Sequence, residues 1–106
     1  MSEQPEIRWT AVGSAADWPE NGGRVVTIGA RRIGVYHHAD GWYALKDICP
    51  HAGIGLAKGP VAEHAVMCVG HGWRFDLRTG KVLGGGNYAV ATYPVRVHDG
   101  RIEVGV

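Results

Sequence analysis

The hydrophobic positions of the chain fall into short runs separated by glycine, proline and other turn-forming residues. Runs rich in Val, Ile, Tyr and Trp and bounded by such residues are typical of β-strands. A short helical turn is predicted at Ala15–Glu20, where Ser14 can cap the first turn. Eight strands are predicted: Ile7–Val12, Arg24–Ile28, Arg31–His37, Trp42–Ile48, Ala65–Cys68, Trp73–Asp76, Thr92–Val97 and Arg101–Val104. The pattern therefore predicts an all-β protein.

Two segments interrupt the rhythm of strands. One is Cys49–Pro60, and the other is Leu83–Tyr88, which contains three consecutive glycines. The glycine run lacks the spacing of a phosphate-binding loop, and no helical pattern follows it. We therefore expect a surface loop there and look to the first segment for chemistry.

Length and charge limit the function classes. With 106 residues, the chain is expected to form one domain over 1–106. The 11 basic and 10 acidic side chains give a formal net charge of +1, so a broad basic field for nucleic acid is absent. No apolar run approaches the roughly 18 residues of a membrane span, and no signal-peptide pattern opens the chain. We expect a soluble, cytoplasmic protein that binds neither nucleic acid nor membrane.

The two cysteines each have a histidine close by in sequence. Cys49-Pro50-His51 and Cys68-Val69-Gly70-His71 lie in separate predicted loops. A disulfide framework is improbable in a chain without an export signal, which favours metal ligation. Two thiolates and two imidazoles suit a 2Fe-2S cluster of mixed ligation, with the thiolates on one iron and the imidazoles on the other. A tetrahedral zinc site and a pair of buried, inert cysteines are the alternatives.

These two boxes resemble those of the Rieske ferredoxin family. The resemblance rests on Cys49–Gly53 and Cys68–Trp73, and it extends through Arg74–Gly80 and Tyr93–Val95. It implies an all-β fold of the Rieske type: an antiparallel sandwich or barrel base with a small cluster-binding lobe at about residues 47–76. It also implies one 2Fe-2S cluster. The ligands implied are Cys49, His51, Cys68 and His71.

The resemblance also implies a function and its partners. Similar small proteins carry one electron from a flavoprotein reductase to a terminal oxygenase, such as a ring-hydroxylating dioxygenase, without catalysing a reaction themselves. A monomer is expected. The small subunit of an assimilatory nitrite reductase is similar in size and in Arg74–Gly80, and it is one alternative. A zinc-stabilised binding module without redox activity is the other.

Departures from high-potential Rieske proteins predict a low reduction potential. Those proteins have two further cysteines that bridge the cluster loops, at positions matched here by Ile54 and Gly70. They also direct two hydroxyl groups at the cluster, where this chain has Trp73 and Phe75. Hydrogen bonds to cluster sulfurs stabilise the reduced, more negative form. Without those donors, the potential is expected at the low end of the Rieske range.

The remaining candidate residues are interpreted structurally. Surface positions are predicted for His37, His38, His64 and His98. Core or loop-supporting positions are predicted for Trp42, Tyr43, Trp73 and Phe75. Pro50, Ile54 and Leu56 are either an apolar rim near the histidine ligands or ordinary loop packing.

Overall fold

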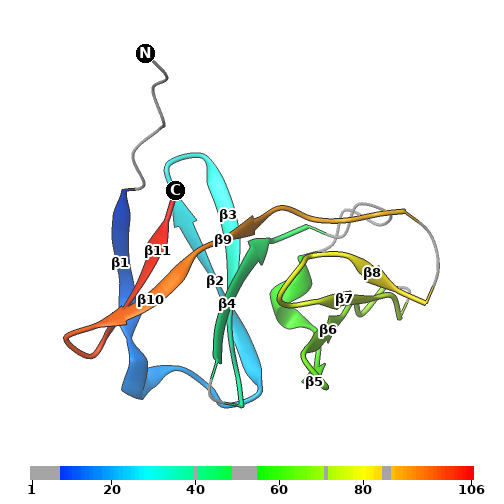
Figure 1. The fold of residues 1–106 in the computed structure, drawn as a ribbon, viewed down its shortest axis with the longest axis horizontal. Coiled ribbons are helices and arrows are strands. Elements are labelled where there is room, and N and C mark those ends of the chain that lie inside the picture. The colour runs from blue at the N-terminus through cyan, green and yellow to red at the C-terminus, as the bar shows by residue number, and fades with distance from the viewer. Residues whose placement is uncertain (1–7, 40, 49–54, 71, 85–86) are drawn as a thin grey trace.

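Figure 1 shows the computed structural model of the protein, which describes residues 8–39, 41–48, 55–70, 72–84 and 87–106. Two short 3-10 turns, η1 (Ala15–Asp17) and η2 (Leu56–Lys58), accompany the strands. The strands are β1 (Trp9–Ser14), β2 (Gly22–Ile28), β3 (Arg31–His38), β4 (Gly41–Lys46), β5 (Val61–Ala62), β6 (Ala65–Met67), β7 (Arg74–Asp76), β8 (Val82–Leu83), β9 (Thr92–Tyr93), β10 (Val95–His98) and β11 (Arg101–Gly105). The all-β fold is therefore confirmed.

The strands form three antiparallel sheets. The outer sheet has the order β1-β11-β10, the central sheet β2-β3-β4-β9 and the small sheet β5-β6-β7-β8. In Figure 1 the central sheet stands between the outer sheet on the left and the small sheet on the right. We call the outer and central sheets together the base, and the small sheet with η2 the lobe.

Alternation along β3 and β4 assigns side chains to two hydrophobic cores. Successive residues of a strand point to opposite faces of its sheet. Ile33 and Val35 of β3 therefore pack toward the outer sheet, whereas Tyr36 packs toward the lobe. On β4, Ala44 packs toward the outer sheet and Leu45 toward the lobe. The central sheet is thus buried on both faces, and it joins the base to the lobe.

The base core lies between the outer and central sheets. Its buried residues are Trp18, Ile33, Val35, Ala44, Ile102 and Val104. The indole Nε1–H of Trp18 donates a 2.9 Å hydrogen bond to the Val35 carbonyl, so this large side chain is buried with its polar atom satisfied. Trp18 follows η1 directly, so this connection between β1 and β2 contributes a large side chain to the base core.

The second core lies between the central sheet and the lobe. Its buried residues are Tyr36, Leu45, Leu56, Ala57, Val61, Val66, Cys68, Phe75, Leu77 and Val90. Burying one large apolar side chain contributes roughly 1.5–3 kcal/mol. The lobe's own strands have only two or three residues each. We infer that apolar contact with the central sheet, rather than its short ladders, stabilises the lobe.

Proline divides one strand that the sequence predicted as continuous. The predicted strand Thr92–Val97 is two strands, β9 in the central sheet and β10 in the outer sheet, and Pro94 separates them. Proline has no N–H to donate to a sheet ladder. Its carbonyl accepts a 2.9 Å hydrogen bond from the Gly105 N–H instead. The chain therefore changes sheets at this residue.

The other predicted strands occur with shifted ends. The fourth ends at Lys46 rather than Ile48, and the first begins at Trp9, whereas predicted Ile7 lies outside the described residues. Strands β5 and β8 were not predicted, because two residues are too few to show an alternating pattern. The helical turn is confirmed as η1, where the Ser14 hydroxyl accepts the Ala16 N–H at 3.3 Å. In the described part of the chain, no helix is long and apolar enough to cross a bilayer.

Candidate functional site

Cys68, one of the predicted ligands, directly follows β6 and begins a tight turn. Its N–H donates to the Trp73 carbonyl at 2.7 Å, and its own carbonyl accepts the Gly72 N–H at 2.8 Å. Gly72 has a φ of +73°, a conformation that is costly for residues with a Cβ. Cys68 is 0 % exposed. The turn therefore holds this thiol in the core at the point where the chain reverses.

The backbone of η2 packs closely against the strand that leads to Cys68. A Cβ at Gly59 would overlap the Met67 carbonyl oxygen, so only glycine fits there. Gly59 donates its N–H to the Leu56 carbonyl at 2.9 Å, and the Met67 N–H donates to the Pro60 carbonyl at 3.0 Å. The end of the first predicted cluster loop and the start of the second are thus adjacent through their backbones.

Asp47 closes the first predicted cluster loop. Its carboxylate Oδ1 accepts the Ala57 N–H at 2.8 Å, a buried bond across ten residues that encloses the first Cys-x-His box. The Asp47 N–H donates to the Arg32 carbonyl at 3.0 Å, which fixes this residue to β3. Hydrogen bonds from a neutral donor to a charged acceptor contribute about 1.5–3 kcal/mol. Asp47 therefore ties both ends of the loop to the central sheet.

The second oxygen of Asp47 is buried but has no hydrogen-bond partner among the described residues. The guanidinium of Arg32 lies 3.7 Å from Oδ2, an ion-pair distance beyond hydrogen-bonding range, and its side chain is mostly exposed. Tyr36 is buried in the same core. Burial, together with the nearby Asp47 charge, raises the pKa of its hydroxyl far above the usual range. Tyr36 is therefore neutral. Asp47, two residues before Cys49, is a buried acidic residue.

The predicted ligands divide between described and undescribed parts of the chain. Cys49, His51 and His71 lie outside the described residues, and Cys68 lies within them. The Cys68 thiol is free of disulfides and buried, on a turn whose backbone is already fixed. A buried thiol with a histidine three residues later in the sequence fits the donor set of a mixed-ligand iron–sulfur cluster. Within the described ranges, no three His, Cys, Asp or Glu side chains form a group that could hold a metal.

The sequence left Leu56 open between an apolar rim and ordinary loop packing, and the structure decides for packing. Leu56 is fully buried in the core between the lobe and the central sheet, so it is not a rim residue. It opens η2, whose apolar side faces inward because Asp47 anchors the next residue. Pro50 and Ile54 lie outside the described residues. Among the described residues, Ile48 just before the first box is 37 % exposed, and Val69 within the second box is 56 % exposed.

The aromatic residues near the boxes are structural, as predicted. Phe75 is fully buried in the lobe core, and Trp73 and Tyr43 pack against that core. The Trp73 ring lies 5.1 Å from that of Tyr88, and Trp42 packs on the base core. Trp73 therefore supports the second box by packing and through its carbonyl.

Surface positions were predicted for four histidines, and this is right only for His98, which is exposed. His37 is half-buried and stacks on Trp42 at 4.2 Å between centroids. His38 is 2.8 Å from the Asn21 Oδ1 through its Nδ1, and its ring lies 4.6 Å from that of His64. His37 is thus covered by a residue of the neighbouring strand, and His38 and His64 by each other across a longer stretch of chain.

Sequence reasoning did not identify the role of Asp47. The signal was a carboxylate within an apolar stretch, Tyr43–Ile48, immediately before the first box. A charged residue in such a place is rarely buried unless it is bonded. Gly59 gave no comparable signal, because only the packing of η2 against Met67 shows that a side chain cannot fit.

Comparison with known proteins gives one family match. The family described as Rieske [2Fe-2S] domain matches residues 8–94, a span that contains both boxes. The anthranilate 1,2-dioxygenase ferredoxin subunit of Burkholderia cepacia is 30 % identical over 107 aligned residues, which cover 100 % of this chain and 99 % of that protein.

Two solved structures are also similar. A chain of the complex of reduced oxygenase and oxidized ferredoxin in carbazole 1,9a-dioxygenase has a TM-score of 0.83 and 28 % identity, with 91 % of each chain covered. A protein of Mycobacterium tuberculosis described as a candidate NADH-dependent nitrite reductase small subunit has a TM-score of 0.90, with 96 % of this chain and 97 % of that chain covered. Its identity is 23 %, so it shows the shared fold alone.

Proposed function

This chain belongs to the Rieske [2Fe-2S] domain family, and from that premise we propose that it carries single electrons between a flavoprotein reductase and a terminal oxygenase. The observation that supports this most is that the family match spans both Cys-x-His boxes over nearly the whole chain. The dioxygenase ferredoxin subunit of similar length supports the same role. The chain is thus an electron-transfer component and not itself a catalyst.

The proposal assigns two ligands to each loop. They are Cys49 and His51 in the first loop, and Cys68 and His71 in the second. Bound there, a 2Fe-2S cluster supplies one-electron redox chemistry. Each loop would contribute one thiolate and one imidazole, so the cluster would join the two loops within the lobe, whose extent was predicted as about residues 47–76. The small sheet itself continues to Leu83.

The described residues support this role because hydrogen bonds hold the ends of both loops. Asp47 holds the first loop closed through the Ala57 N–H. Backbone bonds from Cys68 and Gly72 shape the second loop. Burial of Cys68 also keeps water from its thiol.

A low reduction potential belongs to the same proposal. Phenylalanine and tryptophan have no hydroxyl group, so neither Phe75, buried in the lobe core, nor Trp73, whose carbonyl closes the second turn, can supply one to the cluster. The potential is expected near about −150 mV, the low end of the Rieske range. Spectroelectrochemical titration measures it, and a value near the top of that range would contradict this part of the proposal.

The proposal is tested on freshly purified protein by its visible spectrum before and after dithionite, together with iron, sulfide and zinc content. We expect a red-brown protein that bleaches on reduction, takes up one electron per chain and contains about two irons and two sulfides. A colourless protein containing zinc would instead support the non-redox binding module, because zinc has no redox chemistry.

The partners and the location are tested separately. Electron flow from a flavoprotein reductase to a ring-hydroxylating oxygenase is expected to require this protein in a reconstituted assay. Comigration with a nitrite reductase large subunit in gel filtration, with no transfer to an oxygenase, would favour the nitrite reductase alternative. A monomer and a cytoplasmic location are also proposed, and sedimentation and cell fractionation test them.

A further inference from the structure

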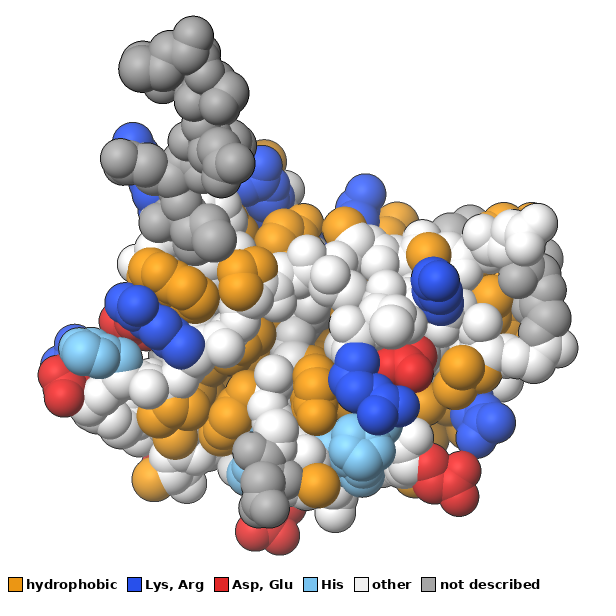
Figure 2. All heavy atoms as spheres, in the orientation of Figure 1, with side chains coloured by type: hydrophobic (Ala, Val, Ile, Leu, Met, Phe, Trp, Pro, Cys, Tyr) orange, Lys and Arg blue, Asp and Glu red, His pale blue; other side chains and the backbone are white. Residues whose placement is uncertain are grey.

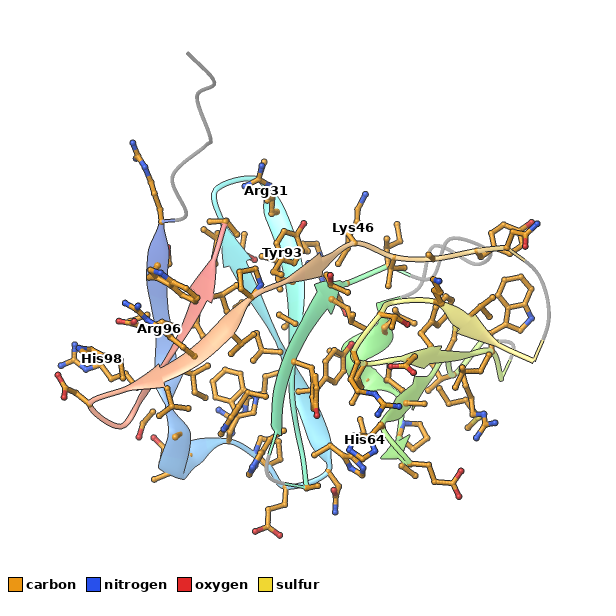
Figure 3. All side chains as sticks on the ribbon, in the orientation of Figure 1. Arg31, Lys46, His64, Tyr93, Arg96 and His98 are labelled. Carbon is orange, nitrogen blue, oxygen red and sulfur yellow. The ribbon has the colours of Figure 1, made fainter. Side chains whose placement is uncertain are left out.

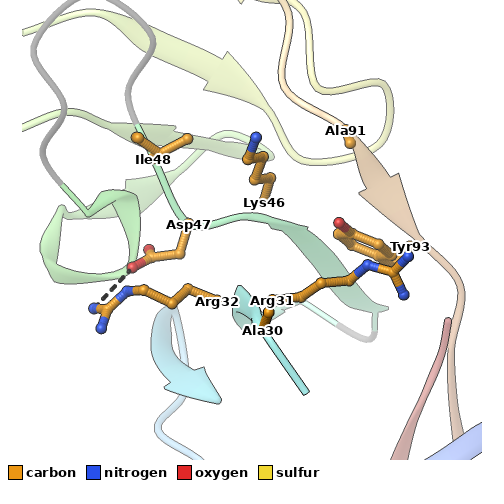
Figure 4. Close-up of a pocket in the computed structure, with 8 residues that line it drawn as sticks. All are labelled: Ala30, Arg31, Arg32, Lys46, Asp47, Ile48, Ala91 and Tyr93. Atoms are coloured by element: carbon orange, nitrogen blue, oxygen red, sulfur yellow. Dashed lines mark ion pairs between the residues drawn. The ribbon is translucent and has the colours of Figure 1, made fainter. Parts of the chain in front are cut away.

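A cavity of about 420 Å³ opens beside the first predicted cluster loop, at the edge of the central sheet. The residues around it come from the β2–β3 turn, the end of β4 and the segment leading into β9 (Figure 4). They are Ala30, Arg31, Arg32, Lys46, Asp47, Ile48, Ala91 and Tyr93. Three cationic side chains therefore surround one opening.

The walls of this cavity are held by backbone hydrogen bonds. The Lys46 N–H donates to the Ala91 carbonyl at 2.9 Å, and the Asp47 N–H donates to the Arg32 carbonyl at 3.0 Å. Arg31 pairs with Ile28 in the register of β2 and β3. Because all three segments are joined in this way, the side chains around the opening start from fixed positions.

The charge of the cavity is not balanced by the side chains that the structure describes. Asp47 is its single acidic residue, and this carboxylate is buried, bonded to Ala57 and paired with Arg32. The side chains of Arg31 and Lys46 form no ion pair with another described residue. The opening thus keeps an excess positive charge.

The cationic side chains lie on one edge of the molecule. Figure 3 shows Arg31 and Lys46 extending outward from the same edge, with the Tyr93 ring between them. In Figure 2, drawn in the same orientation, blue Lys and Arg spheres lie along this upper edge, and the visible red carboxylates lie below it. Exposed Ile48 and half-buried Tyr93 add apolar surface. Apolar and aromatic area rimmed by charge is typical of a protein interface.

We propose that this cavity is a docking site for a carboxylate-rich surface of a redox partner protein, which makes one face beside the cluster loop electrostatically selective. This proposal rests on the proposed electron-carrier function. Lys46 precedes Cys49 by three residues, so their Cα atoms are at most about 11 Å apart. A partner bound at this edge therefore lies close to the first predicted ligand. An inorganic anion would leave Ile48 and Tyr93 uncovered, whereas a protein surface covers them.

Charged small oxidants test the local charge without requiring the natural partner. Reduced holoprotein is mixed with anionic hexacyanoferrate(III) or with cationic tris(phenanthroline)cobalt(III) in a stopped-flow instrument. We expect the Arg31→Glu/Lys46→Glu variant to react about tenfold more slowly with the anion at low salt, and faster with the cation, because charged patches change association rates by such factors. Arg31→Gln/Lys46→Gln is expected to show the same directions with smaller changes.

The matched control is Arg8→Glu/Arg101→Glu, which changes the net charge by the same amount just before β1 and at the start of β11. Both side chains are exposed, and neither lines the cavity. We expect a change of no more than about twofold for this control. Equal effects from both double variants would show a response to net charge alone and would overturn the proposal. Unchanged visible spectra would show that the variants retain the site.

A peptide competitor identifies the kind of occupant. An acetylated hexa-aspartate peptide is expected to inhibit the reaction of the wild type with hexacyanoferrate(III), and not that of Arg31→Glu/Lys46→Glu. Inorganic phosphate at matched ionic strength is expected to inhibit less. Equal inhibition by phosphate would assign a small-anion site instead, and cosedimentation with phosphatidylserine vesicles that needs Arg31 and Lys46 would assign a membrane surface. Either result overturns the docking proposal.

The experiment separates this proposal from the function on which it rests. Wild-type protein that bleaches and reoxidises, with rates insensitive to the cavity variants, would overturn the docking site and leave the electron-carrier role intact. A wild-type protein without a reducible cluster would overturn both.

Discussion

The base and the lobe are stabilised in different ways. In the base, the longer strands β2, β3 and β4 pair over six or seven positions, and alternation directs their side chains into a core. In the lobe, strands of two or three residues pair over two or three positions each. Isolated short ladders are only marginally stable. The lobe therefore depends on apolar contact with the central sheet, on the close backbone approach at Gly59 and on the buried carboxylate of Asp47.

This difference has a functional consequence. The base has extended ladders, whereas the lobe has few regular hydrogen bonds of its own and provides Cys68, one of the predicted ligands. Binding of a ligand that requires several side chains contributes directly to the stability of the segment that provides them. We infer that cluster binding and lobe stability are linked, and that the base is largely independent of both.

Loss of the cluster is expected to have the largest effect, and to destabilise the lobe much more than the base. Cys68→Ser removes one proposed ligand from the core, and amide exchange in the lobe is expected to become faster, as its opening free energy falls by roughly 4 kcal/mol or more. Exchange in β2, β3 and β11 is expected to change little. Hydrogen-exchange mass spectrometry measures both regions. Val69→Ser, an exposed change on the same turn, is the control. Equal loss of protection in base and lobe would contradict the contrast.

Glycine substitutions compare the two regions directly. Gly59→Ala places a Cβ on the Met67 carbonyl oxygen, so it is expected to lower the free energy of unfolding by about 3 kcal/mol. Gly29→Ala, in the β2–β3 turn of the base, meets no atom within 4 Å. Its φ of +61° is expected to cost only about 1–2 kcal/mol. Chemical denaturation measures both, and a smaller loss at Gly59 would show that η2 can shift.

Removal of the buried carboxylate tests how the first loop is held. Asp47→Ala deletes the acceptor of the Ala57 N–H and is expected to cost about 2 kcal/mol, with faster exchange of the Ala57 amide. Asp47→Asn keeps an oxygen acceptor and should cost less. In the base, Glu103→Gln weakens the exposed ion pair with Arg96, and an effect below about 1 kcal/mol is expected. Similar losses of unfolding free energy for Asp47→Ala and Glu103→Gln would be evidence against a stabilising role of the buried Asp47–Ala57 hydrogen bond.

The smallest effect expected is a dependence on acid pH that arises in the lobe. Partial burial opposes the charge of Asp76, but hydrogen bonds from the Arg78 N–H and guanidinium outweigh it and hold the pKa of this carboxyl below its usual value. Because the folded pKa lies below the unfolded one, its contribution is complete above the unfolded pKa and is lost as pH falls through the folded pKa.

Asp76→Asn should therefore lower the free energy of unfolding by about 1 kcal/mol at neutral pH. The difference from wild type should shrink as pH falls below about 4. Melting curves across pH measure it. Asp99→Asn is the control, because its side chain is exposed and asparagine tolerates its φ of +52°. A difference that persists unchanged at low pH would show that the charge of Asp76 is not involved.

Much of the base follows from the sequence alone. The runs Arg31–His37 and Trp42–Ile48 predict two strands, because they are rich in β-branched and aromatic residues and are bounded by turn residues. The two Cys-x-His boxes predict a metal centre because their donor atoms suit few other chemistries. Both conclusions depend only on which residue types lie close together in the sequence, so they can be drawn without knowledge of the tertiary structure.

The rest depended on tertiary structure, because it requires contacts between residues far apart in the chain. Leu56 was open to interpretation as a rim residue until η2 was seen packed against the central sheet. The role of Asp47 appears only with Ala57 beside it, and the absolute need for glycine at position 59 appears only with Met67 beside it. The excess charge at Arg31 and Lys46 likewise arises because two strand ends meet at one edge. Sequence determines the ligand types and the strands, whereas packing determines which side chains are buried, bonded or left exposed.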